Sequence, residues 1–176
     1  MISNTGLQVE RISYGAEPVD LDAIKRHLSI DFDDHNTLLE ELIVSAREDI
    51  EAYLGLSIVD STVTAYWDSI CSSELPYGPV KTIISATDGV DDIDVTYSGI
   101  GYKKVIAERT YPTSITYEAG FTGGVPTAIK LAVMKHATDN FEQRTGISIG
   151  GNQTIQKFDN DWKNTCKRFS RKNFLQ

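Results

Sequence analysis

The sequence is poor in the residues that most reaction chemistry needs. It has three histidines and two cysteines in 176 residues. Cys71 and Cys166 are far apart and form no C-x-x-C pair, which is typical of reduced thiols in a cytoplasmic protein. His27, His35 and His136 stand in no H-E-x-x-H motif and in no Cys/His cluster with zinc spacing. We therefore expect no metal site, and His136 is interpreted as a packed or hydrogen-bonded side chain.

The motifs of common enzymes are missing as well. There is no G-x-S-x-G nucleophile elbow and no G-x-G-x-x-G fingerprint. The glycine-rich stretch at 119–124 precedes a predicted helix, but no Gly-Lys-Ser/Thr sequence follows it. We interpret this stretch as a hinge, and we expect neither a catalytic residue nor a cofactor.

The chain also has no apolar run approaching the ~20 residues that a membrane span requires. Residues 1–6 have no basic start and no apolar segment, so they do not resemble a signal peptide. With 40% hydrophobic and 24% charged residues, the composition is that of a folded globular protein. We predict an N-terminal arm at 1–17, a main domain at 18–146, and a linker with a C-terminal helical arm at 147–176.

Charge is distributed unevenly along the chain. Residues 157–176 hold six basic and two acidic side chains, a net charge of +4. Residues 1–156 hold 11 basic and 23 acidic side chains, a net charge of −12. An acidic body repels duplex phosphate, so general DNA binding by the body is not expected. The basic tail has three open interpretations: a solvated helix face, a contact with an acidic protein surface, or a contact with nucleic acid.

Three segments have the apolar period of amphipathic helices. The longest, about 34–54, has a stripe of apolar residues at three- and four-residue steps, with Asp33 or Asp34 as the cap and Gly55 as the stop. Segments at about 20–28 and 126–144 have shorter stripes. The outer face of the longest helix is strongly acidic, which is explained by solvation or by docking of a basic partner. Its acidic residues include Glu40, Glu41, Glu48 and Glu51.

Between the second and third helices the pattern changes to strands. Residues 62–67, 92–97 and 114–118 alternate with a period of two, and 80–87 is rich in β-formers before an Asp88-Gly89 turn. Residues 9–14 have a weaker pattern and either add an edge strand or contact a neighbour. We predict an α+β fold, mainly α. It has a three-helix core (about 20–28, 34–54 and 126–144), a small antiparallel hairpin insertion (about 61–118) and a C-terminal amphipathic helix arm.

That last helix is predicted from Asp159 or Asn160 to about Asn173. Trp162, Cys166 and Phe169 recur at helical spacing and form a narrow apolar stripe. Basic residues cover the remainder of the helix.

Several short motifs follow one another in a characteristic order. Leu75-Pro76-x-x-Pro79-Val80 is the most specific motif. The other motifs are Leu21-x-x-Ile24-Lys25-x-x-Leu28, Leu38-Leu39-x-x-Leu42-Ile43-x-x-Ala46-Arg47, Tyr53-Leu54-Gly55, Tyr117-x-x-Gly120-Phe121 and Val125-Pro126-x-x-Ile129-Lys130. In this order they resemble the head–tail connector (adaptor) proteins of long-tailed bacteriophages, also described as DNA-packaging proteins. The similarity covers about residues 18–146.

The resemblance implies a structural virion protein that joins the portal of the phage head to the tail. It implies a ring, dodecameric in the virion, around a channel through which DNA passes without specific binding. The implied partners are the portal protein, a stopper or tail-completion protein, and further copies of the chain. The implied location is the virion neck, after synthesis in the host bacterial cytoplasm.

Two interfaces follow as hypotheses. The C-terminal helix is predicted to dock onto the portal or an adjacent subunit through Trp162, Lys163, Lys167, Arg168, Phe169, Arg171 and Lys172. The acidic face with Glu40, Glu41, Glu48 and Glu51 is predicted to line the channel or to meet a neighbouring subunit. The alternative function is a small-terminase-like DNA-packaging factor that binds nucleic acid through its basic tail.

Overall fold

The chain forms two compact units, and each is built from two separate stretches of sequence. A computed structural model describes residues 6–106, 108–109, 111–142, 148–149, 155–156 and 161–170. The sheet unit comprises Met1–Ala16 and Gly55–Gly124, and the helical unit comprises Glu17–Leu54 and Val125–Gln176. The chain therefore passes between the units three times. The third passage, at Gly124, follows the glycine-rich stretch that the sequence predicts as a hinge.

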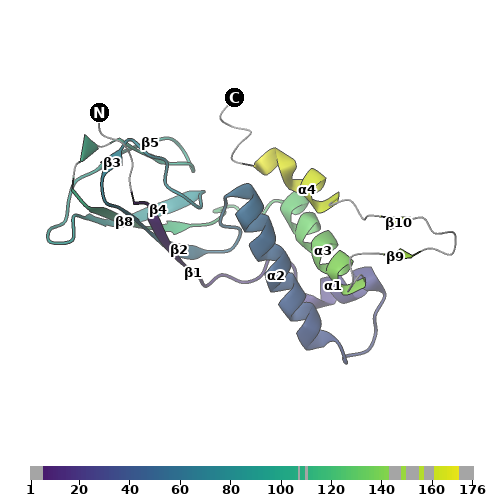
Figure 1. The fold of residues 1–176 in the computed structure, drawn as a ribbon. Helices are drawn as coiled ribbons and strands as arrows, with labels where there is room; N and C mark the ends of the chain where they lie inside the picture. The colour runs from purple at the N-terminus through teal and green to yellow at the C-terminus, as the bar shows by residue number, and fades with distance from the viewer. Residues whose placement is uncertain are drawn as a thin grey trace. The chain divides into compact units, whose positions relative to one another are not determined.

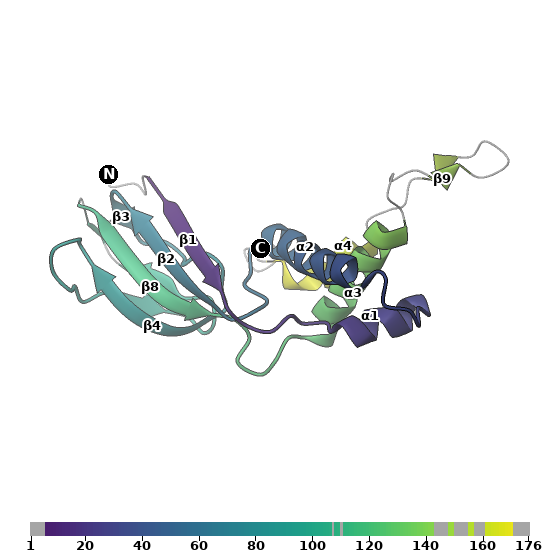
Figure 2. The same ribbon diagram turned by 90° about the horizontal axis from the view of Figure 1, so that it is seen from below.

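The sheet unit is organised around a four-stranded antiparallel sheet with strand order β1-β2-β8-β4 (Figure 2). Its strands are β1 (Gln8–Ser13), β2 (Ser61–Trp67), β4 (Val80–Thr87) and β8 (Thr113–Ala119). β2 and β8 are central, and every second residue of both is buried. This alternation is what a sheet with one covered face requires, because successive side chains point to opposite sides.

The buried face of the sheet is completed by two short strand pairs and the loops that carry them. β3 (Ile70–Cys71) pairs with β7 (Glu108–Arg109), and β5 (Thr96–Ser98) pairs with β6 (Lys104–Ile106). Ile70, Leu75 and Val105 come from these parts and are fully buried with the sheet residues. The largest side chains of this core, Trp67 and Tyr117, are also fully buried.

The connectivity of the sheet differs from the predicted set of hairpins. β2 pairs along its whole length with β8, more than forty residues later in the chain, and not with the strand that follows it. β1 pairs with β2, so the edge-strand interpretation of residues 9–14 is confirmed. The predicted turn at Asp88-Gly89 is confirmed, because the Asp88 side chain accepts hydrogen bonds from the backbone of Val90 and Asp91.

The described residues of the helical unit form four α-helices (Figure 1). They are α1 (Leu21–Leu28), α2 (Asn36–Leu54), α3 (Thr127–Glu142) and α4 (Asp161–Cys166), and a 3₁₀ turn, η1 (Lys167–Phe169), continues α4. α3 contacts each of the other three α-helices. The unit also includes the paired two-residue strands β9 (Ser148–Ile149) and β10 (Ile155–Gln156), in a segment that the sequence predicts only as a linker.

The predicted stripe of the longest helix is largely confirmed. Leu39, Ile43, Ala46, Ile50 and Leu54 of α2 are all buried. The helix ends at a glycine with a φ of +71° at position 55, as the sequence predicts. The side chain of Asp20 accepts a hydrogen bond from the backbone of Ala23 and so caps α1.

The predicted α+β class is correct, but the prediction of a mainly α protein with a three-helix core is wrong. The protein is not a mainly α structure with a three-helix core and a small β insertion, because the four-stranded sheet has a large core of its own. A fourth helix packs on α3, whereas the sequence predicts a C-terminal helix arm outside the three-helix core. The last helix is also shorter than predicted, since it becomes 3₁₀ at Lys167 and Ser170 has extended backbone. Within the described residues, no helix is long and apolar enough to cross a membrane.

Candidate interaction surfaces

The acidic face of α2 carries a shallow groove of about 400 Å³. Its lining residues recur at three- and four-residue steps on the side of α2 opposite the buried stripe. Val44 is half-buried among carboxylates that are exposed to solvent. The lining residues are Thr37, Glu40, Glu41, Val44, Ser45 and Glu48. The predicted face therefore combines negative charge with a small apolar floor.

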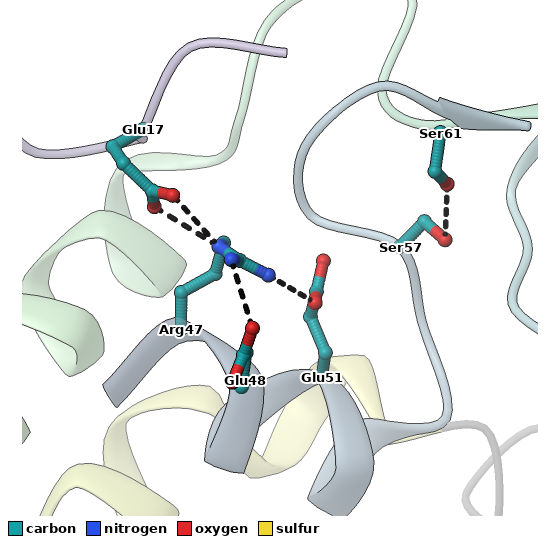
Figure 3. A network of polar contacts seen from close by, with 6 residues as sticks. All are labelled: Glu17, Arg47, Glu48, Glu51, Ser57 and Ser61. Carbon is teal, nitrogen blue, oxygen red and sulfur yellow. Dashed lines mark hydrogen bonds and ion pairs between the residues drawn. The ribbon is translucent and has the colours of Figure 1, made fainter. Parts of the chain in front are cut away.

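Glu51 does not belong to this face, contrary to the prediction. Its side chain is fully buried and accepts a 2.7 Å hydrogen bond from Arg47 Nη1 (Figure 3). Arg47 Nε also donates to both carboxylate oxygens of Glu17, at 3.1 and 3.0 Å, and Nη2 donates to Glu48 at 3.3 Å. Two ionised groups can be buried together here because each satisfies hydrogen bonds of the other.

The surroundings of Arg47 fix its charge and its role. Burial alone would lower its pKa, but the carboxylates of Glu51 and Glu17 outweigh burial and raise the pKa above its ordinary value. The guanidinium therefore stays charged. Because Glu17 is the first residue of the helical unit and Glu51 lies near the end of α2, Arg47 joins the start of this unit to its longest helix.

The C-terminal helix is attached to its own chain through Trp162. The indole is 5% exposed and contacts the His136 ring at a centroid distance of 4.7 Å and the Tyr53 ring at 5.4 Å. His136 Nε2 lies 2.8 Å from Asp49 Oδ2, so the interpretation of His136 as a packed, hydrogen-bonded residue is confirmed. Trp162 thus packs between α2 and α3.

Two further contacts attach α4 to α3. Lys135 Nζ lies 2.5 Å from Asp161 Oδ2 and 3.3 Å from Thr165 Oγ1. Cys166 is fully buried, and burial raises the pKa of its thiol to about 11. Cys71 and Cys166 are both free thiols.

The basic residues of the predicted C-terminal interface are only partly described. Lys167 and Arg168 are exposed, and the Arg168 guanidinium lies 4.9 Å from the ring centre of Phe169. Lys163 lies over the Trp162 ring at 5.2 Å. Arg171 and Lys172 are outside the described residues. The structure therefore brings aromatic and basic side chains together at this end of the helical unit, with Trp162 already packed inside it.

The sequence-based prediction missed two exposed aliphatic side chains on loop tips of the sheet unit. Ile100, between β5 and β6, is 99% exposed, and Val90, after β4, is 89% exposed. Ile100 stands in a Gly-Ile-Gly sequence followed by Lys103 and Lys104. An aliphatic residue between two glycines is typical of a tip, but it has none of the periodicity from which helices and strands are predicted.

The described residues contain no group of three or more His, Cys, Asp and Glu side chains placed to hold a metal ion. A pocket rich in titratable groups lies between α1, α3 and α4 and has a volume of about 260 Å³. It holds Lys135, Asp139 and Asp161. Burial raises the pKa of Asp139, and its neighbours Glu142 and Asp161 add to this while His136 opposes it. The charged residues of this pocket are explained by ion pairing between α3 and α4, as in the Lys135–Asp161 contact.

Comparison with known proteins finds a match to one family over part of the chain. Residues 18–87 match the model of the family described as "Phage gp6-like head-tail connector protein". The matched stretch runs from α1 through α2 and β2 to β4, so it includes parts of both units. The sequence matches none of the curated proteins with which it was compared.

The fold is similar to that of chains from gene transfer agent (GTA) particles. One is from the neck of an empty GTA particle computed with C6 symmetry, with a TM-score of 0.68 and 16% identity over 91% of this chain and 94% of that chain. Another is from the virion of a native particle, with a TM-score of 0.64 and 14% identity over 92% and 94%. A third is from the neck of a native particle computed with C12 symmetry, with a TM-score of 0.61 and 15% identity over 91% and 94%.

These similarities include the whole architecture of the chain, because more than nine-tenths of both partners align. At this level of identity the structural matches establish the fold, and the family match adds the sequence relationship over residues 18–87. The resemblance predicted from the sequence is therefore confirmed: this chain is similar to the gp6-like head–tail connector proteins of phages and shares the fold of GTA neck structures.

Proposed function

We propose that this protein is a structural component of a phage-like particle, located at the neck, where it joins the head to the tail. The family match over residues 18–87 carries the proposal, because it includes elements of both units and the most specific sequence motif. The fold similarity to GTA neck structures supports it. In this role the protein catalyses no reaction. It is made in the cytoplasm of the host bacterium before assembly.

The protein forms a ring around the DNA channel in this proposal, with twelve copies expected from the family resemblance. Similar chains occur in neck structures computed with C6 and C12 symmetry. A ring requires a heterologous interface, in which each subunit presents different surfaces to its two neighbours. The portal protein lies on one side of the ring, and a stopper or tail-completion protein lies on the other.

The charge of the chain suits a channel that DNA crosses without binding. Residues 1–156 carry a net charge of −12. Like charge keeps a sliding duplex from adhering to a wall, whereas a basic wall would retain it. Glu40, Glu41 and Glu48 are candidates for the channel wall or for a subunit interface, because they are exposed on one face of α2.

The C-terminal end is proposed to contact the portal or an adjacent subunit. Lys163, Lys167, Arg168 and Phe169 supply charge and an aromatic ring there, and Arg171 and Lys172 extend the basic sequence. Trp162 contributes by holding α4 against Tyr53 and His136, so that the basic residues are presented from a fixed helix.

The function can be tested by mixing the purified protein with tailless, DNA-filled capsids that bear a portal. Electron microscopy is expected to show a new ring at the portal vertex. The small-terminase-like alternative predicts instead that the protein is retained on DNA and released as salt is raised. Retention on DNA together with bare portal vertices would overturn the proposal.

The C-terminal contact has its own test. Deleting residues 157–176 removes α4 and the basic sequence, and it is expected to abolish attachment to capsids. A milder variant, Lys167→Gln with Arg168→Gln, keeps α4 and is expected to weaken attachment in a salt-dependent way. Unchanged attachment of both variants would show that this end does not form the contact.

A further inference from the structure

Ile100 is presented as an isolated apolar knob on the sheet unit. Its side chain is 99% exposed, at the tip of the β5–β6 hairpin. The glycines on either side have φ angles of +95° and +73°, a conformation that other residues adopt only under strain. A Cβ at Gly99 would lie 2.6 Å from the Tyr102 carbonyl oxygen, so the tight turn requires glycine there.

The base of this hairpin is fixed to the remainder of the sheet unit. Val105 is fully buried, and its N–H donates to the Ser73 carbonyl at 2.7 Å. The Leu75 N–H donates to the Lys103 carbonyl at 2.9 Å, and the Val80 N–H donates to the Gly101 carbonyl at 2.5 Å. The knob is therefore held on a rigid support, which lowers the entropy lost when it binds.

A complementary surface exists on the helical unit of the same sequence. The α2 groove has a volume of about 400 Å³, with Val44 at its floor and Glu40, Glu41 and Glu48 around it. The knob is followed by Lys103 and Lys104, of which Lys104 is exposed. Among the described residues, Lys103, Lys104, Glu40 and Glu41 form no ion pair with one another or with other side chains.

The loop tip that carries Val90 differs from the tip that carries Ile100 in the charge of its neighbouring residues. Val90 is 89% exposed on its own loop tip, but Asp88, Asp91 and Asp92 surround it in sequence. An acidic tip is repelled by an acidic groove, whereas the basic tip that carries Ile100 is attracted to it. Of these two apolar tips, only Ile100 matches the groove in charge.

We propose that Ile100 of one copy of this chain inserts into the α2 groove of the next copy, with Lys103 and Lys104 opposite Glu40, Glu41 and Glu48. The contact joins the sheet unit of one subunit to the helical unit of its neighbour. Because knob and groove are different surfaces, the interface is heterologous, and repetition closes a ring or continues as a filament. The inference rests on the proposed neck function for its setting, since it assigns the surfaces through which that ring forms.

Disulfide trapping between free copies tests the contact without capsids. One copy carries Ile100→Cys and the other carries Val44→Cys, both in a Cys71→Ser background in which the remaining thiol, Cys166, is fully buried. A size tag on one copy separates heterodimers from homodimers on a gel. The control pair combines Val90→Cys with Val44→Cys. We expect the Ile100 pair to form about tenfold more heterodimer than the control, equivalent to about 1.4 kcal/mol, and equal yields would overturn the proposal.

Charge reversal provides a second arm. Glu41→Lys with Glu48→Lys in the groove copy is expected to reduce the trapped heterodimer to the control level. Lys103→Glu with Lys104→Glu in the knob copy is expected to restore it, because the pairing is re-formed with inverted signs. Failure of the combined variants to recover would show that the lysines do not face the groove.

A third arm separates this inference from the neck function. Ile100→Glu changes a fully exposed side chain and is expected to leave the subunit folded but to prevent ring formation at the portal vertex. If the variant forms rings as the unmodified protein does, the knob proposal is wrong and the neck function stands. If the unmodified protein forms no ring on portal-bearing capsids, the neck function itself fails.

Discussion

The two units hold distant segments together by different contacts. In the sheet unit, backbone ladders join β8 to β2 and β4 over an apolar core, and one ion pair, Lys81 with Asp60, is added to them. In the helical unit, ion pairs join separate segments, such as Arg47 with Glu17 and Lys135 with Asp161. Since backbone ladders depend little on charge while ion pairs respond to pH and salt, the units should differ in what destabilises them.

Each unit contains its own natural probes. Trp67 and Cys71 lie in the sheet unit, whereas Trp162 and Cys166 lie in the helical unit, and the chain has no other tryptophan or cysteine. Replacing one tryptophan by phenylalanine leaves the other to report on its own unit. The comparison between the units can therefore be tested by fluorescence and by thiol labelling.

The largest effect is expected from Arg47→Met in the helical unit. It leaves the buried Glu51 carboxylate without its arginine partner, which is expected to lower the free energy of unfolding by about 3–5 kcal/mol. The measurement is urea unfolding followed by Trp162 fluorescence in a Trp67→Phe background. Adding Glu51→Leu is expected to recover most of the loss, since the uncompensated charge is then removed. A loss under ~1 kcal/mol would indicate that these ion pairs contribute no more than solvent-exposed salt bridges do.

The sheet unit should be most sensitive to a cavity. Ile115 is fully buried in the centre of β8, and Ile115→Ala is expected to cost about 2–5 kcal/mol. Unfolding is followed by Trp67 fluorescence in a Trp162→Phe background. Thr116→Ala is the matched control, because Thr116 lies on the opposite face of the strand. It loses only the 3.1 Å contact with the Thr64 hydroxyl, so the free energy of unfolding is expected to fall by about 1 kcal/mol. Equal losses of unfolding free energy in the two variants would contradict a core that covers only one face of the sheet.

A smaller effect is expected at the attachment of α4. Lys135→Met removes a partly exposed ion pair with Asp161 and is expected to weaken the attachment by about 0.2–1 kcal/mol. The measurement is the rate of Cys166 labelling, which is slow because the thiol is buried and its pKa is about 11. The rate should rise up to about fivefold, while the rate for Cys71 in the same molecule stays constant. A Lys25→Met control changes the same charge at α1, and it should leave Cys166 unaffected.

The smallest effect concerns Asp33. Two hydrogen bonds lower the pKa of this exposed carboxyl below its ordinary value. The hydrogen bond from Lys25 has the larger effect, and the one from Asn36 has the smaller effect. Because the folded-state pKa is lowered, the carboxylate stabilises the fold above its ordinary pKa, and this contribution is lost as pH falls through the folded-state pKa. NMR titration of the Asp33 side chain should show a higher pKa in Lys25→Met, and an unchanged titration would contradict the pairing.

What the sequence could predict depended on whether the signal was local. The α2 stripe and the alternation of 62–67 and 114–118 each follow from neighbouring residues, and all three elements are present. The pairing of β2 with β8 was out of reach, because strand partners across such a separation leave no pattern in either segment. Glu51 was assigned to the surface because ionised side chains are seldom buried, and its Arg47 partner reveals the exception only in three dimensions.

The position of a predicted interface residue could also be inferred where the signal was local, but not where it depended on distant residues. The acidic residues Glu40, Glu41 and Glu48 were placed on one face by helical period alone, and they do share an exposed face. The docking surface of Trp162 was not predictable, because a narrow apolar stripe fits an intramolecular partner as well as a foreign one. Ile100 was missed because a lone exposed aliphatic residue in a turn has no periodicity to detect.

The threefold passage of the chain between the units has a consequence for synthesis on the ribosome. β8, the central partner of both β2 and β4, is translated only after residue 112, so β2 has β1 alone as a partner until then. The helical unit begins at Glu17, directly after β1, but acquires α4 only once Asp161 has been translated. Neither unit can finish folding in the order in which it is made, and a nascent chain released before Asp161 would leave the Trp162 site between α2 and α3 unfilled.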